Sequence, residues 1–142
     1  MKRIENEYWV YYLEPEKAKL LDQHKTGKWM YFFTDVDFAD KITSEAVKRG
    51  IVTEAKHSNA ANGVCCFYLH GDDLPSHKKV ISYFLENGLI QKTKTGKLYN
   101  ISFKYDDQTR AGEYGDDFKS EIKLCDFLDL NTGEFLTEGG SK

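Results

Sequence analysis

In the C-terminal third of the chain, a short stretch gathers side chains that could hold an anion. Residues 101–114 read as a strand that runs into a loop, and within a few positions of one another they carry Lys104, Asp106, Thr109 and Arg110. A lysine supplies a point charge, and an arginine guanidinium supplies paired donors that match a phosphate or a carboxylate. The spacing therefore predicts an anion-binding site where this strand ends.

Side-chain alternation adds residues from other predicted strands to the same surface. Successive strand residues point to opposite faces of a sheet, so that the apolar set faces a core and the other set faces away from it. In their own predicted strands, Lys56, Tyr68 and Lys104 all face away from the core. The predicted ligand-binding residues are Lys28, Trp29, Lys56, Tyr68, Lys104, Asp106, Thr109 and Arg110.

Aromatic side chains beside these lysines could stack on a nucleic-acid base. Two pairs fit this role, either Trp29 with Tyr31 or Trp9 with Tyr11. Tryptophan also packs in cores, and we expect at least one of the two tryptophans to be buried there. The outward lysines have an alternative role as well, because solvated lysines at a sheet edge oppose aggregation.

The elements that must position these residues are strands separated by two amphipathic helices. Aromatic and β-branched runs predict the strands, and apolar residues that recur about every four positions predict the helices. The predicted strands are 8–13, 28–33, 51–57, 64–70, 97–105 and 121–128, and the predicted helices are 37–48 and about 74–87. We expect a short helix or loop over 14–24 and a tight turn into an edge strand over 130–135.

Two helices cannot cover both faces of a sheet of six or seven strands as aromatic as these. The economical arrangement is an α+β layer, in which a largely antiparallel sheet carries both main helices on one face. The other face is then left for solvent or for a ligand. The order strand, helix, strand, strand, helix, strand also matches a ferredoxin-like split arrangement, which is the rival topology.

The size and composition fit one globular domain. The chain has 142 residues, of which 40% are hydrophobic and 30% are charged. We therefore expect a single domain over 1–142 with a flexible tail at 136–142. The net charge of −3 argues against strong, non-specific attraction to nucleic acid, although a local basic patch can still bind anions.

Cysteine usage and the N-terminal residues bear on the cellular compartment. Cys65 and Cys66 are adjacent in a predicted strand and point to opposite faces, so they suit neither a disulfide nor a shared metal. Three free thiols fit a reducing compartment. The sequence shows neither an apolar signal segment nor a stretch of transmembrane length. We expect a cytoplasmic protein without a membrane partner, a metal or a cofactor.

Three short motifs resemble those of one protein family. They are Gly27-Lys28-Trp29-Met30, then Ala55-Lys56, and then Phe103-Lys104 followed by Asp106, Thr109, Gly112 and Tyr114. With these motifs, which cover roughly residues 28–114, the chain is similar to the basophilic-leukaemia-expressed protein family, an uncharacterised group found in eukaryotes and bacteria. The resemblance implies a fold similar to that of the cap-binding translation initiation factor, a curved antiparallel sheet with helices on its convex side.

Cap-binding proteins hold a methylated base between two tryptophans and hold its phosphates with arginine and lysine. In this chain both tryptophans fall in predicted strands and not in facing loops. Likeness of fold does not by itself carry function.

Three functions follow as hypotheses, and whether the protein is an enzyme stays open. The first is a binding domain that holds a phosphate-bearing ligand, either a nucleotide or an RNA end, on the helix-free face. The second comes from the resemblance, because bacterial members are associated with a phosphothreonine-lyase-like domain that would eliminate phosphate from a phosphopeptide. The third is a protein-interaction or inhibitor module.

The lyase hypothesis needs a lysine base, a histidine acid and a cation that binds the phosphate. The residues that could fill these roles are Lys56 or Lys104, His57 or His70, and Arg110. The sequence contains no phosphate-cradling glycine loop and no nucleophile elbow. Convergence of the basic residues on one pocket would favour the first two hypotheses, and their dispersion would favour the third.

Overall fold

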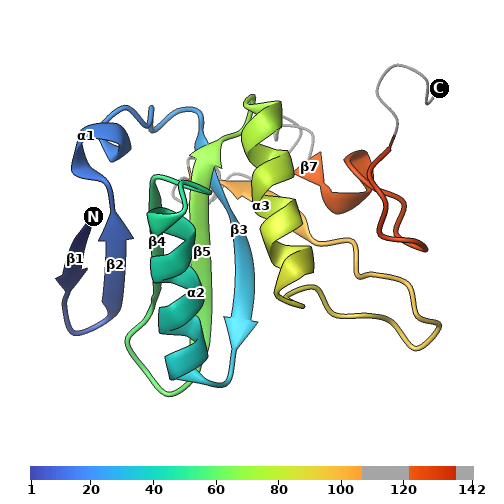
Figure 1. Ribbon diagram of the computed structural model, residues 1–142, viewed down its shortest axis with the longest axis horizontal. Coiled ribbons are helices and arrows are strands. Elements are labelled where there is room, and N and C mark those ends of the chain that lie inside the picture. The colour runs from blue at the N-terminus through green and yellow to red at the C-terminus, as the bar shows by residue number, and fades with distance from the viewer. Residues whose placement is uncertain (107–121, 137–142) are drawn as a thin grey trace, which may run out of the picture.

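Residues 1–106 and 122–136 are described by the computed structural model, in which seven strands form one open antiparallel sheet (Figure 1). Within these residues there are three α-helices, and the two longer ones lie on one face of the sheet. The predicted α+β arrangement is confirmed. The elements are β1 (Lys2–Glu5), β2 (Trp9–Leu13), α1 (Pro15–Ala18), β3 (Thr26–Phe33), α2 (Val36–Lys48), β4 (Glu54–Ser58), β5 (Gly63–His70), α3 (Leu74–Glu86), β6 (Ser102–Tyr105), β7 (Ile122–Lys123) and the 3-10 helix η1 (Leu124–Asp126).

The strand order shows how the chain crosses the sheet. From one edge to the other it is β1-β2-β4-β5-β3-β6-β7. Strands β3 and β4 are both antiparallel to β5, so they run parallel to each other with β5 between them and α2 connecting them. The part from β3 to β6 therefore has the split arrangement expected as the rival topology. Strands β1 and β2 widen the sheet beyond β4.

Helix α2 begins and ends close to where its sequence predicts. The Asp35 carboxylate accepts hydrogen bonds from the backbone N–H groups of Asp37 and Phe38, which satisfies donors that have no partner within the helix. Its apolar stripe, which includes the fully buried Ile42, packs toward the sheet. The helix stops before Gly50, whose φ of +74° lies in the left-handed region that glycine adopts without strain.

Trp29 lies in the core on the helix-covered face, and its side chain is 0% exposed. Its indole N–H donates a hydrogen bond of 3.0 Å to Nδ1 of His77 on α3. The other ring nitrogen of His77, Nε2, donates to the carbonyl oxygen of Gly71 at 2.8 Å. The prediction that Trp29 stacks on a ligand is wrong, because the indole is enclosed by α3 and by the rings of Phe103 and Phe127.

Strand β4 is shorter than predicted, and β1 was not predicted at all. The predicted strand 51–57 loses its first residues because the N–H groups of Ile51 and Val52 donate to the carbonyl of Ala46 and close the end of α2. All residues of β1 are exposed. It carries no apolar alternation to predict it, and its antiparallel pairing with β2 holds it in the sheet.

The predicted strands 97–105 and 121–128 are also shorter than expected. Before β6 the chain turns aside, because the N–H groups of Leu98 and Tyr99 donate to the carbonyls of Leu130 and Gln91 and not to β3. After β7 the chain enters η1, which begins where the backbone N–H of Lys123 donates to an Asp126 carboxylate oxygen at 2.9 Å. Within the described residues, no helix is long and apolar enough to cross a membrane.

Candidate anion-binding face

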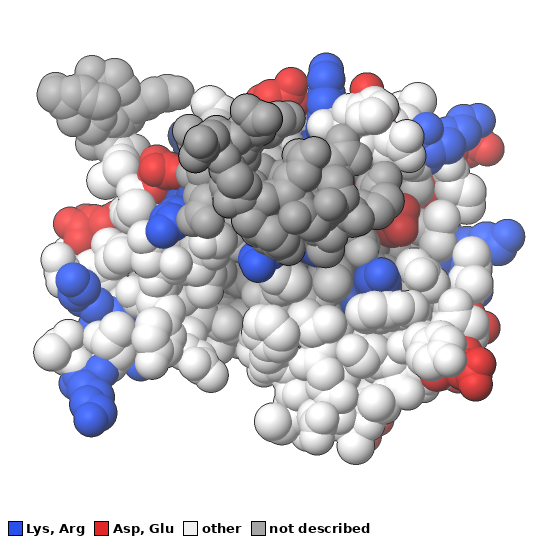
Figure 2. Space-filling model, turned by 180° about the vertical axis from the view of Figure 1, so that it is seen from behind, with Lys and Arg blue, Asp and Glu red and all other residues white. Residues whose placement is uncertain are grey.

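Three lysines from three strands lie on the helix-free face of the sheet. Lys28 on β3 has Tyr68 of β5 as its partner on one side and Lys104 of β6 on the other. Lys56 on β4 belongs to the next row of the same face, opposite Cys66. These side chains alternate with core residues, so they point away from α2 and α3. We call the surface around Lys28, Lys56 and Lys104 the lysine face; Figure 2 shows the molecule from this side, with basic side chains near its centre.

The pair Lys28 and Lys104 places two like charges in direct cross-strand register. Such a pair destabilises a sheet. Asp106 partly offsets the repulsion, because its Oδ1 lies 2.8 Å from Lys28 Nζ, with side chains that are 26% and 13% exposed, respectively. Lys104 is exposed and makes no ion pair with another described residue. The face thus keeps a cation that is available to a ligand.

Lys56 is a half-buried cation held among aromatic rings. Its Nζ lies 3.7 Å from the ring centroid of Trp9, 5.5 Å from that of Tyr11 and 5.9 Å from that of Tyr68. These contacts are cation–π interactions, which stabilise the charged form. Burial nevertheless lowers the pKa of Lys56, and the nearby charge of Lys28 lowers it further. A bound anion would therefore stabilise the charged form of this ammonium group, which has lost much of its water.

A second carboxyl group on this face, that of Glu54, does not fully balance its positive charge. Glu54 lies in register with Tyr68, in the same row as Lys28. Burial raises the pKa of Glu54, although the charge of Lys56 acts in the opposite direction. Burial also raises the pKa of the Tyr68 hydroxyl, so this group stays neutral and can donate a hydrogen bond. With Asp106 paired to Lys28, the face carries an excess of positive charge.

The structure brings together most, but not all, of the predicted site. Lys28, Lys56, Tyr68, Lys104 and Asp106 meet on one face. The predicted residues Thr109 and Arg110 lie outside the described residues.

Of the two aromatic pairs proposed from the sequence, only one belongs to this face. Trp9 and Tyr11 lie beside Lys56, whereas Tyr31 packs edge-on against Phe38 of α2 on the opposite side. Sequence reasoning missed Glu54. Its position two residues before Lys56 was a signal that both point to the same face.

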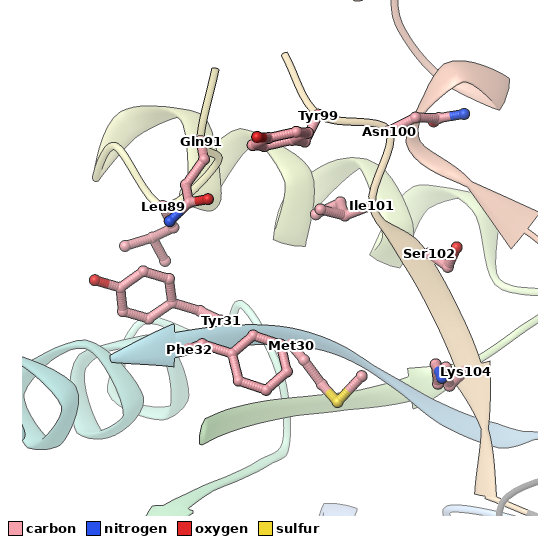
Figure 3. A pocket seen from close by; sticks show the side chains of 10 residues that line it. All are labelled: Met30, Tyr31, Phe32, Leu89, Gln91, Tyr99, Asn100, Ile101, Ser102 and Lys104. Carbon is pink, nitrogen blue, oxygen red and sulfur yellow. The ribbon is translucent and has the colours of Figure 1, made fainter. Parts of the chain in front are cut away.

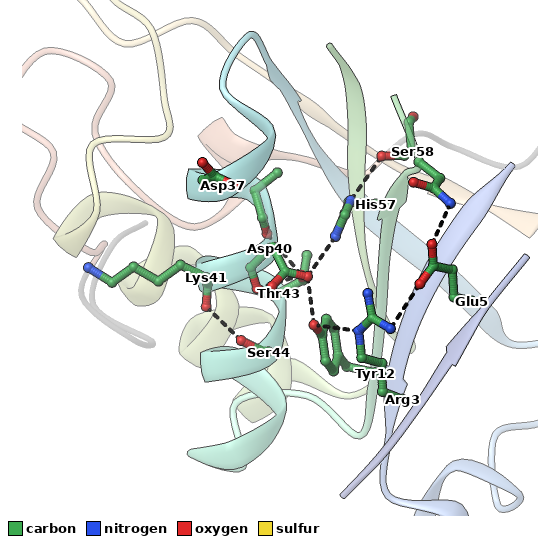
Figure 4. A network of polar contacts seen from close by, with 12 residues as sticks. Arg3, Glu5, Tyr12, Asp37, Asp40, Lys41, Thr43, Ser44, His57 and Ser58 are labelled. Atoms are coloured by element: carbon green, nitrogen blue, oxygen red, sulfur yellow. Dashed lines mark hydrogen bonds and ion pairs between the residues drawn. The ribbon is translucent and has the colours of Figure 1, made fainter. Parts of the chain in front are cut away.

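Of the two histidines proposed for phosphate elimination, His57 lies on the opposite face of the sheet from Lys56. His57 is 2% exposed and lies on the helix-covered face, where its Nε2 is 3.0 Å from Asp40 Oδ1 (Figure 4). Its Nδ1 is 2.9 Å from the carbonyl oxygen of Ser58. His70 uses Nε2 to accept a hydrogen bond from the backbone N–H of Asp22 at 2.8 Å. The role of His57 as a proton donor beside Lys56 is therefore wrong, since the sheet separates the two side chains.

The same network ties the first strands to α2 and is structural in character. The Tyr12 hydroxyl donates to Asp40 Oδ1 at 2.6 Å, and Arg3 Nε donates to the Tyr12 oxygen at 3.1 Å (Figure 4). Every member of this chain of contacts already has a partner. It joins β1, β2 and α2 and leaves no group directed at the lysine face.

The described residues hold no metal-binding cluster, and the chain matches no known family. Among residues 1–106 and 122–136, no group of three or more His, Cys, Asp or Glu side chains could hold a metal ion. The resemblance to the basophilic-leukaemia-expressed protein family stays a prediction. A scan against protein-family models gives no match for this chain, and a search among curated proteins gives none either.

Proposed function

We propose that this protein binds a phosphate-bearing ligand, a nucleotide or an RNA end, on its lysine face. The observation that carries the proposal is the direct register of Lys28 with Lys104, with the half-buried Lys56 in the next row. Folding alone gains nothing from placing like charges side by side, whereas an anion between them turns the repulsion into attraction. Residues that weaken a fold in this way often serve a binding function.

The spacing of the lysines suits more than one phosphate group. Neighbouring strands lie about 5 Å apart, so Lys28 and Lys104 can reach a single phosphate together. Lys56 lies two strands from Lys28, at a distance of about 10 Å, which a second phosphate or the sugar of a nucleotide spans. Trp9 and Tyr11 then offer aromatic surface for a base at that end of the face.

A fold like that of the cap-binding translation initiation factor forms part of this proposal. Its support is the antiparallel sheet, which carries both longer helices on one face and the candidate ligand-binding residues on the other. The phosphate-elimination alternative has less support, because the sheet separates His57 from Lys56 and Nε2 of His70 accepts a hydrogen bond from the backbone N–H of Asp22.

The test is equilibrium binding at several salt concentrations. The ligands are ATP, a short RNA with a 5′ triphosphate, and the same RNA with a 5′ hydroxyl. We expect the triphosphate forms to bind and the affinity to fall with salt, because cations on the protein release counterions from the ligand. We expect Lys104→Ala and Lys56→Ala each to weaken binding by about five- to tenfold.

Lys41→Ala is the matched control, because Lys41 is an exposed lysine of α2 on the opposite side of the sheet. It removes the same charge and should leave the Kd unchanged. Equal losses for all three variants would indicate a non-specific charge effect. Unchanged binding in both Lys104→Ala and Lys56→Ala would place the site elsewhere.

A further inference from the structure

Among the described residues, one edge of β3 has no neighbouring strand over more than half of its length. Strand β3 pairs with β5 from Thr26 to Phe33, but its register with β6 is limited to Gly27 and Lys28. From Trp29 onward, no described residue pairs with this edge. Every second residue of an antiparallel strand directs its N–H and C=O groups to a given side. This edge therefore presents backbone donors and acceptors that a further strand could use.

A pocket of about 460 Å³ lies beside this edge, between β3 and the segment before β6 (Figure 3). Met30 and Phe32 line it from the helix-free side of β3, and Tyr31 lines it from the helix-covered side. Because side chains from both faces of one strand contribute, the pocket lies next to the strand, where a neighbouring strand would run, and not above a face of the sheet.

The far wall of the pocket comes from the chain that turns away from β3. Ile101 and Ser102 line this wall. Their segment diverges from β3 because the backbone N–H groups of Leu98 and Tyr99 donate hydrogen bonds to the carbonyl oxygens of Leu130 and Gln91. The pocket between the two walls, of about 460 Å³, has room for side chains of an extended segment that runs along β3.

The side chains around the pocket define the chemistry of an occupant. Leu89 and Ile101 give it an apolar lining. Phe32 and Tyr99 stand at its mouth with 70% and 47% of their surface exposed. Exposed large apolar side chains gathered at one place mark interaction sites. Lys104 contributes an exposed positive charge at one end, so the complementary occupant carries a negative charge there.

We infer that the open edge of β3 binds an extended peptide of a partner protein as an added strand. The peptide backbone pairs with β3 from Trp29 to Phe33, an apolar side chain enters the pocket, and an acidic side chain lies against Lys104. This is strand addition, in which backbone hydrogen bonds give affinity and a side-chain pocket gives specificity. The inference goes beyond nucleotide or RNA binding and does not depend on it, because the strand edge and the pocket are separate observations.

Selection from a display library of random linear peptides, followed by synthesis of the enriched peptides, tests this inference. We expect the enriched sequences to combine an apolar with an acidic residue. Fluorescence anisotropy should show that Phe32→Ser weakens binding by about tenfold and that Lys104→Gln weakens it by about fivefold. Leu74→Ser is the matched control, because Leu74 on α3 is also apolar, is 55% exposed and lies outside the pocket. Its Kd should not change.

Methylation of peptide amide nitrogens separates strand pairing from simple apolar contact and uses the unaltered protein. We expect N-methyl groups at the positions that face β3 to abolish binding and those at alternate positions to have little effect. Peptide binding that tolerates every N-methyl group would overturn the inference. So would a library without enriched sequences, or an equal loss in Phe32→Ser and Leu74→Ser.

Hydrogen exchange gives a second, independent readout. The amides of Trp29–Phe33 that face the open edge should exchange rapidly in the free protein and slowly with peptide bound. Slow exchange in the free protein would contradict the inference, because the edge would then be paired already. Lys56→Ala separates the two proposals, since Lys56 lies on β4, outside the pocket and separated from β3 by β5: it should weaken nucleotide binding and leave peptide binding unchanged.

Discussion

Lys28 and Lys104 occupy directly opposed positions on β3 and β6, and both point to the helix-free face. The ammonium of Lys28 has a carboxylate partner in Asp106, at 2.8 Å, whereas Lys104 has none among the described residues. This asymmetry separates two roles on one surface. Lys28 is held in a fixed position by its ion pair, and Lys104 is free to follow a ligand. It also links stability to binding, because the charges that would attract an anion repel each other without one.

Lys104→Gln should stabilise the free protein. Removing one of two like charges that face each other across a strand pair is expected to raise the free energy of unfolding by about 0.5 kcal/mol. Urea denaturation at low and high salt measures the effect, and the gain should shrink at high salt, where repulsion is screened. The same variant should bind phosphate-bearing ligands less tightly. A lower stability at low salt would show that Lys104 makes a favourable contact instead.

Trp29→Phe should destabilise the protein, although the aromatic ring is kept. The indole N–H is the partner of His77 Nδ1 in a site that is fully buried, and phenylalanine leaves that nitrogen without a donor. The cost is expected to be about 2 kcal/mol, from the unpaired acceptor and the space left by the smaller ring. Chemical denaturation measures it. Trp9→Phe is the control and should cost much less, because Trp9 is partly exposed on the other face.

His77 should make the protein sensitive to acid. Burial lowers the pKa of His77, whereas its hydrogen bond to Gly71 and the charges of Asp73 and Asp72 act in the opposite direction. The unfolded chain therefore binds a proton that the folded protein takes up only at lower pH. The stabilisation from neutral His77 is present above the unfolded pKa of about 6.5 and is lost as the pH falls through the folded pKa.

The measurement compares urea denaturation of the wild-type protein and of His77→Gln at pH values on both sides of about 6.5. Glutamine has both a donor and an acceptor but does not titrate in this range. The wild-type protein should lose more stability than His77→Gln on acidification. Parallel loss in both proteins would assign the acid sensitivity to other groups.

The sequence predicted the layers of this fold better than the ends of its strands. The apolar stripe with Ile42 is a local signal, and α2 formed as it indicates. The start of β4 was not predictable in this way, because Ile51 and Val52 have strand-like side chains but donate to the end of α2. Competition between a helix end and a strand for the same N–H groups depends on the whole structure.

In the candidate site, too, local features could be predicted from the sequence, and features that depend on the whole fold could not. Alternation along single strands turned Lys56, Tyr68 and Lys104 to one face, as observed. Which strands become neighbours depends on topology, so the opposition of Lys28 and Lys104 could not be read from the sequence. Trp29 was misplaced because an aromatic strand offers planes on both of its faces. Its contacts with His77, 48 residues away in the sequence, and with the rings of Phe103 and Phe127 hold it in the core.

Lys56 should make ligand binding fall at alkaline pH. Burial lowers the pKa of Lys56, so the free protein loses this charge at a lower pH than an ordinary lysine, whose pKa is about 10.4. A bound anion favours the charged form, and binding above neutral pH should therefore take up a proton. Calorimetric titration with ATP at several alkaline pH values, in buffers of different ionisation enthalpy, measures both quantities. Lys56→Arg keeps its charge over this range, and its affinity should stay nearly constant with pH. An equally steep fall in Lys56→Arg would show that another group titrates, and no proton uptake by the wild-type protein would place the bound anion away from Lys56.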